Sequence, residues 1–198
     1  MKKTLRSHKI SVVLLCLLCL PLVFAEAAFA AENKGDSLFF LSPTYGWYFP
    51  ASGKTKDAFG DSWGGWGIAV NLEALGWGTS GWEVAGLSLR PYFGYFHADK
   101  GDNDAHIIPV GIDARWDLMQ LGVVSPYVGV GVAGYGIRFE DREAGVDTGW
   151  RGAFGGRLMF GADITRWFNI QAAYNLISDV EGYNLSGFSL QGKLKIYF

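Results

Sequence analysis

The closing stretch Phe188-Ser-Leu-Gln-Gly-Lys-Leu-Lys-Ile-Tyr-Phe198 decides the fold class. One parity of this stretch is apolar and contains Phe188, Leu190, Leu194, Ile196 and Phe198. The other parity is mostly polar and contains Ser189, Gln191, Lys193, Lys195 and Tyr197. Period-two alternation predicts a β-strand with one apolar and one polar face. A strand that is apolar outside, charged inside and aromatic at its end is typical of a transmembrane β-barrel.

The first thirty residues predict export. Basic residues precede the apolar run 12–24, and Ala28-Phe29-Ala30 offers a small-x-small cleavage site. This pattern predicts a cleaved, Sec-type signal peptide at 1–30. Cys16 and Cys19 both lie inside it, so the mature chain has no cysteine. Disulfides, thiolate metal sites and a cysteine nucleophile are thereby excluded.

The mature chain is mildly acidic and fits one domain. Removing residues 1–30 changes the formal net charge from −2 to −5, and no basic stripe remains, which argues against nucleic-acid binding. No apolar run is long enough for a membrane helix. The 28 glycines and 16% aromatic residues favour strands. We expect a short periplasmic segment at 31–36 and one barrel domain at 37–198.

Alternating apolar residues predict eight strands after the signal peptide. Their expected ranges are 37–49, 63–73, 82–96, 106–118, 125–139, 150–164, 168–177 and 188–198. An even number of such strands predicts an all-β, up-and-down antiparallel barrel. Pro43 predicts a bulge or strained pairing in the first strand. The apolar parity of the fifth strand changes near Ala133-Gly134, which predicts a bulge there.

The connections and tryptophans predict an orientation. The polar, longer connections are expected at 50–62, 97–105, 140–149 and 178–185, and the shorter ones at 75–81, 119–124 and 165–167. Longer loops face the exterior in such barrels, so both termini are expected in the periplasm. This places Trp47, Trp63, Trp66 and Trp150 near the outer interface and Trp77, Trp82, Trp116 and Trp167 near the inner one. Two aromatic girdles are therefore expected.

The polar parity predicts a charged barrel interior. Its expected members are Glu73, Arg90, Asp113, Arg115, Asp117, Arg151, Arg157, Asp163, Lys193 and Lys195. Eight strands leave an interior that side chains fill, and buried charges must pair. We therefore expect a paired plug rather than a pore, with Arg90 bonded to Asp113, and Arg157 bonded to Asp163 or to neighbours of Lys193. A soluble lipocalin-like barrel would reverse the two faces and would set these charges outside.

Two motifs resemble a known group. Ser125-Pro-Tyr-Val-Gly-Val-Gly-Val-Ala-Gly-Tyr135 resembles the Pro-Tyr-Val-Gly-rich strand of the OmpA-like and opacity-type outer-membrane barrels. The end of the chain resembles their assembly signal, which implies that Gly192, Leu194, Ile196 and Phe198 are read by the barrel-assembly machinery. Lys195 departs from this signal, which has an apolar residue there. The resemblance implies the outer membrane of a Gram-negative bacterium and periplasmic chaperones during biogenesis. We expect no peptidoglycan-binding domain after Phe198.

No catalytic, cofactor-binding or metal-binding residues are predicted. Ser178 and Glu181 superficially match a lipid A deacylase, but Leu176 stands where that enzyme has its histidine. The acidic stretches 99–104 and 140–143 lack the spacing of an EF-hand. We expect a non-enzymatic monomer that serves envelope integrity or surface recognition, in contact with outer-membrane lipid, lipopolysaccharide and a ligand at its loops. The alternatives are a narrow channel for small solutes or hydrophobic compounds and, more remotely, a lipid A-modifying enzyme.

Overall fold

The computed structural model describes residues 40–71, 87–118, 123–142 and 144–197. The signal peptide predicted at 1–30, the segment 31–36, Glu73, Trp77, Trp82 and Phe198 lie outside the described residues. The elements are β1 (Phe40–Pro50), α2 (Gly53–Phe59), β2 (Trp63–Val70), β3 (Leu87–Lys100), β4 (Asn103–Asp117), β5 (Ser125–Asp141), β6 (Val146–Asp147), β7 (Arg151–Asp163), β8 (Phe168–Ile177), β9 (Gly187–Leu194) and β10 (Ile196–Tyr197).

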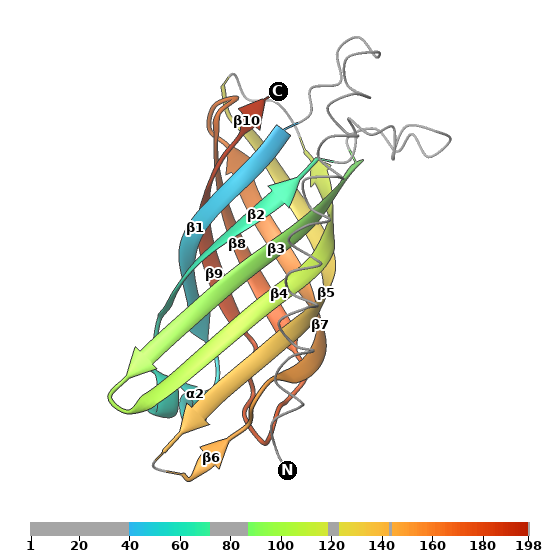
Figure 1. Cartoon of the computed structure of the whole chain (residues 1–198). Helices are drawn as coiled ribbons and strands as arrows, with labels where there is room; N and C mark the ends of the chain where they lie inside the picture. Colours follow the sequence, from blue (N-terminus) through green and yellow to red (C-terminus); the bar gives the residue numbers. More distant parts are fainter. Residues whose placement is uncertain (1–39, 72–86, 119–122, 143, 198) are drawn as a thin grey trace, which may run out of the picture.

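The strands close into one barrel (Figure 1). Each long strand pairs antiparallel with the next along the chain, and β1 completes the ring by pairing with β9 and β10. β9 and β10 form a single crossing that is interrupted at Lys195, and β6 is a two-residue extension beside β5. The predicted eight-stranded, up-and-down antiparallel barrel is confirmed.

The wall of the barrel is apolar on its outer face. In β7, Phe154, Leu158 and Phe160 are exposed, whereas Arg157 and Met159 are buried. The other strands repeat this alternation, which excludes a soluble barrel that buries its apolar face. An exposed apolar band around a closed barrel is a lipid-facing surface. Among the described residues, no helix is long and apolar enough to cross a membrane.

The bulge predicted near Ala133-Gly134 is wrong. β5 keeps one register with β4 from Asp104↔Glu140 to Asp117↔Tyr127, and one register with β7 throughout their pairing. The apolar parity changes because the barrel interior itself changes from polar to apolar along β5. Its valines face outward, and Tyr135, Ile137 and Phe139 face inward at the other end of the strand.

Pro43 interrupts the seam at which the barrel closes. β1 pairs with β10 at Phe40 and Leu41 and with β9 from Thr44 onward, so the pairing is lost around Pro43. Proline has no N–H to donate. The register is the same on both sides of the gap, and β1 pairs with β2 without a break. The expected disturbance is therefore an interrupted ladder and not a bulge.

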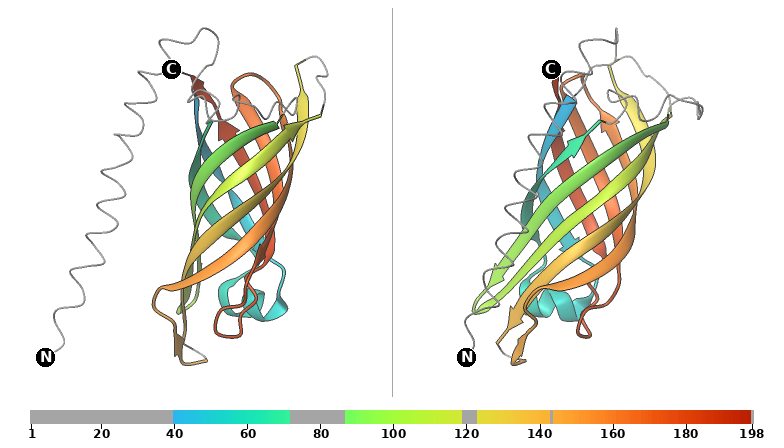
Figure 2. Two further views of the ribbon diagram at one scale, coloured as in Figure 1. Left: turned by 90° about the vertical axis from the view of Figure 1, so that its right-hand side faces the viewer. Right: turned by 45° about the vertical axis from the view of Figure 1, so that its right-hand side comes forward.

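Two connections differ from expectation. Gly101 and Asp102 alone join β3 to β4, and Gly101 has φ 65°, so the predicted loop 97–105 is a tight hairpin turn. The predicted loop 50–62 contains α2, which lies across one end of the barrel (Figure 2). We call this the α2 end. The opposite end, where β1 begins and β10 ends, is called the terminal end.

Candidate functional site

The interior at the α2 end is an aromatic layer. Its large side chains come from β1 to β5, from α2 and from the connection between β8 and β9. They are Tyr48, Phe59, Trp63, Phe96, Ile107, Ile137, Phe139, Tyr183 and Leu185, all buried. The ring of Phe59 lies 5.4 Å from that of Phe139 and 5.5 Å from that of Tyr183. The expectation of a polar interior is therefore wrong at this end.

Hydrogen bonds fix α2 to the rim of the barrel. Thr55 Oγ1 donates to the carbonyl of Asn184 at 2.8 Å, and Lys100 Nζ donates to the carbonyl of Asp57 at 2.6 Å. A seven-residue helix has little intrinsic stability in water, so these contacts and the buried Phe59 ring hold it in place. α2 is thus a cap on the aromatic layer.

A second buried contact holds the connection between β8 and β9. Tyr183 Oη donates to Asp141 Oδ2 at 2.6 Å, and its ring packs edge-on against Phe139. Removal of water from the phenol, together with the Asp141 carboxylate, raises the pKa of Tyr183 to about 12. The phenol therefore remains a protonated donor at neutral pH, which keeps this connection packed under α2.

Loss of the Phe59 ring should free the cap. Replacing a buried phenylalanine by alanine costs about 3–5 kcal/mol, so Phe59→Ala should raise tryptic cleavage after Lys54 and Lys56 by roughly tenfold or more. The measurement is the cleavage rate of the refolded protein at these two sites. Asp57→Ala is the matched control, because its exposed side chain leaves the carbonyl free to accept Lys100. Equal cleavage rates in the two variants would show that Phe59 does not anchor the cap.

A buried ion pair crosses the middle of the barrel. Arg157 Nε donates to Asp113 Oδ1 at 2.7 Å, and Nη2 donates to Oδ2 of the same carboxylate. The guanidinium lies 3.5 Å from the ring centre of Tyr92. A bidentate pair of this kind is among the stronger interactions available to buried charges. We call Arg157 and Asp113 the central pair.

A glycine lets the two side chains meet. Asp113 on β4 and Arg157 on β7 flank β5 at Gly131, which is the register partner of both. A Cβ at Gly131 would collide with Asp113 Oδ1. The predicted pairing of Arg90 with Asp113 is wrong, although the two are register partners. The carboxylate instead bonds across the gap at Gly131.

A second group of charges fills the terminal end. Asp163 accepts from Arg115 Nη2 at 2.6 Å and from Lys195 Nζ at 2.7 Å. The predicted pairing of Asp163 with Arg157 is therefore wrong. The Arg115 guanidinium also lies 3.7 Å from the ring centre of Tyr127 and bonds Asp117 at 2.6 Å. We call Arg115, Asp163 and Lys195 the basal network.

The remaining predicted charges lie around these groups. Lys193 Nζ donates to Gln171 Oε1 at 2.7 Å inside the barrel, and the Arg90 side chain is half-buried. Arg151 was expected inside but lies at the α2 end, where its exposed side chain pairs with Glu181 at 3.3 Å. Arg151 alternates with the inward-facing residues of β7. It is the first residue of that strand, however, and lies beyond the aromatic layer. Lys195 points to Asp163, which explains why a lysine is tolerated within the closing strand.

Three residues of the interior site are uncharged and were not identified from the sequence. Tyr92 and Tyr127 stack on the two buried guanidinium groups, and Asn169 donates to Asp163 at 2.7 Å. All three have the inward parity of their strands. That parity alone could have identified them as interior residues but not as partners of specific charges.

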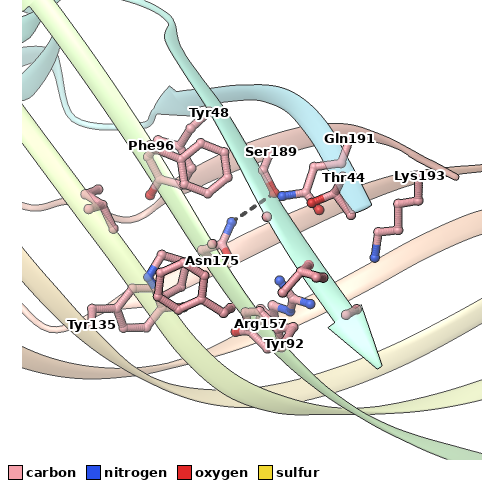
Figure 3. A pocket seen from close by; sticks show the side chains of 17 residues that line it. Thr44, Tyr48, Tyr92, Phe96, Tyr135, Arg157, Asn175, Ser189, Gln191 and Lys193 are labelled. Atoms are coloured by element: carbon pink, nitrogen blue, oxygen red, sulfur yellow. Dashed lines mark hydrogen bonds between the residues drawn. The ribbon is translucent and has the colours of Figure 1, made fainter. Parts of the chain in front are cut away.

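The space between the aromatic layer and the central pair is small (Figure 3). It is a cavity of about 20 Å³, bordered by Tyr48, Tyr92, Arg157, Gln191 and Lys193. That volume holds about one water molecule. The side chains here fill the barrel, as expected for eight strands.

Five of the six described tryptophans form two sets on the outer wall. Trp47, Trp66 and Trp150 are exposed toward the α2 end, and Trp116 and Trp167 are exposed toward the terminal end. Trp63 was expected in the first set but is fully buried under α2, where its Nε1 donates to the carbonyl of Gly60 at 3.1 Å.

Known proteins share this fold. No protein-family model and no curated protein matches the sequence. The crystal structure of Neisserial surface protein A is 14% identical, with 81% of this chain and 97% of that chain covered and a TM-score of 0.58. The outer membrane enzyme PagL is 15% identical, with coverages of 79% and 98% and a TM-score of 0.49. The attachment invasion locus protein Ail of Yersinia pestis is 11% identical, with coverages of 80% and 97% and a TM-score of 0.45. The similarity to Neisserial surface protein A shows that the chain has the fold of a small outer-membrane barrel.

Proposed function

We propose that the protein is a closed, non-enzymatic scaffold of the outer membrane that supports envelope integrity and presents a recognition surface at its α2 end. The observation that carries this proposal is the filled interior. A capped aromatic layer, the central pair and the basal network follow one another along the barrel axis. A barrel closed in this way offers its outer wall and its rim to partners, and not its lumen.

The proposal places the α2 end at the cell surface and residues 1–30 in a cleaved signal peptide. β1 begins and β10 ends at the terminal end, and outer-membrane barrels keep this end in the periplasm. The α2 end carries exposed charges of both signs on anchored segments, as a rigid recognition surface requires. They include Lys54, Asp57, Arg142, Arg151 and Glu181.

A deletion strain separates the scaffold from the channel. Loss of a scaffold should increase entry of a hydrophobic fluorescent dye into cells, whereas loss of a channel should leave dye entry unchanged or lower it. Plasmid-borne wild-type protein should restore the barrier, as should a variant with Lys54→Ala and Arg151→Ala at the recognition surface. No change in dye entry upon deletion would contradict a role in envelope integrity.

One observation favours the channel as a second candidate. The ladder between β1 and the closing strand is interrupted around Pro43, and an interrupted seam is where a barrel wall could open sideways. Uptake of small hydrophobic compounds, compared between wild type and Pro43→Val, tests this candidate. An uptake rate that depends on Pro43 would favour the channel. An unchanged lipid A mass profile in the deletion strain would exclude the enzymatic alternative.

A further inference from the structure

A cluster of rings lies on the outer wall near the α2 end. His106 Nε2 donates to Asp104 Oδ2 at 2.8 Å, so in the neutral ring Nδ1 accepts the hydroxyl proton of Tyr95, also at 2.8 Å. The ring of His97 stacks on that of His106 with centroids 4.7 Å apart. A carboxylate on one nitrogen and a hydroxyl on the other fix the orientation of the His106 imidazole. The rings are therefore held in place before any ligand arrives.

A fourth ring and a cation extend this cluster. A Cβ added at Gly136 would lie 3.8 Å from Trp150 Cε3, so the indole packs over this glycine. The centroids of the Trp150 and His106 rings are 6.3 Å apart. Arg138 is the register partner of His106 and lies on the same outer face. Among the described residues, Arg138 has no ion pair, whereas Glu140 nearby is bonded to Arg142. We call Tyr95, His97, His106, Arg138 and Trp150 the rim cluster.

The rim cluster lies at the border between the apolar band and the polar hairpin. Phe93 and Val110, on the membrane side of the cluster, are exposed apolar residues. On the other side of the cluster, β3 ends at Lys100 and β4 begins at Asn103. The hairpin therefore extends about 10 Å beyond His97, at 3.3 Å per residue. In the proposed orientation, with the apolar band in the membrane core, this height faces the headgroups of the outer leaflet.

We propose that the rim cluster binds the phosphorylated sugar headgroup of an outer-leaflet glycolipid. Arg138 supplies the cation for a phosphate, because guanidinium groups bind phosphate in a bidentate manner. The Trp150 indole, the most exposed ring of the cluster, offers a face on which the C–H groups of a sugar ring pack, and phosphatidylglycerol has no such ring. Below the cluster, Gly134 and Gly152 leave open space on the wall, where one acyl chain can lie. The inference rests on the proposed orientation, which places the α2 end in the outer leaflet.

Native mass spectrometry of protein purified from outer membranes tests this site with added diphosphoryl lipid A. Arg138→Ala should weaken lipid A binding roughly tenfold, as expected for one charge-assisted hydrogen-bonding group. Arg166→Ala is the matched control, because Arg166 lies beside exposed Trp167 at the terminal end and should not affect binding. His106→Phe keeps a ring and removes both nitrogens, and should weaken binding by releasing the Tyr95 contact.

Two results would overturn the proposal. Equal losses in Arg138→Ala and Arg166→Ala would show that binding is general attraction to the barrel surface. Displacement of lipid A by equimolar phosphatidylglycerol would show that the sugar is not recognised. Because the purified protein exposes both ends, these results do not depend on orientation. Tryptic cleavage after Lys54 in the Phe59→Ala variant on intact cells, where the cap is freed, tests orientation separately.

Discussion

Arg157→Met should lower the free energy of unfolding by about 3–5 kcal/mol, because it leaves the Asp113 carboxylate buried without its partner. Both side chains are almost fully buried, so bulk water does not solvate the carboxylate that remains. The measurement is equilibrium unfolding in guanidinium chloride of protein refolded into lipid vesicles. Tyr92 also loses the guanidinium that lies over its ring.

The double variant Arg157→Met with Asp113→Leu provides the control. It removes both charges, so its stability should return to within about 1–2 kcal/mol of wild type, since a buried pair can often be replaced by apolar residues. If the two single losses simply added in the double variant, the central pair would not be coupled. That outcome would contradict the proposed closure by a paired charge.

Asp163→Ala should also cost about 3–5 kcal/mol, because Arg115 and Lys195 then share the terminal end without their common carboxylate. The two cations would repel each other at close range in a partly buried site. Unfolding in guanidinium chloride again measures the loss, and protein migration without heating reports whether the barrel still closes.

Asp117→Ala is the matched control for this variant. Asp117 bonds the same arginine, but its side chain is 45% exposed. An exposed ion pair is worth about 0–1 kcal/mol, so this variant should remain close to wild type. Similar losses in Asp163→Ala and Asp117→Ala would show that burial does not determine the strength of the basal network.

The strands were predictable because the membrane imposes a strict alternation. In β4, Val110 and Ile112 face outward while Asp113 and Arg115 face inward, and no alternative secondary structure fits that pattern. The eight crossings and the lipid-facing wall follow from this rule. Alternation defines the ends of a strand less strictly. A loop was therefore predicted at 97–105, where β3 and β4 continue to a tight turn at Gly101.

The partners of the interior charges were not predictable from alternation. Parity places Asp113 and Arg157 inside, but their bond depends on the missing side chain of Gly131, which is visible only once three strands are in register. The cap was missed for a related reason. α2 is short and polar in sequence, and Phe59 is buried only because the aromatic layer lies beneath it.

Single-channel recording tests the closed barrel most directly. Protein purified from outer membranes is inserted into a planar lipid bilayer, with insertion confirmed by migration of the reconstituted sample without heating. The filled interior predicts a silent membrane, because the cavity above the central pair holds about one water molecule. Steady openings of the wild-type protein, with a conductance that changes in Arg157→Ala, would show that the interior is a path and would contradict the scaffold.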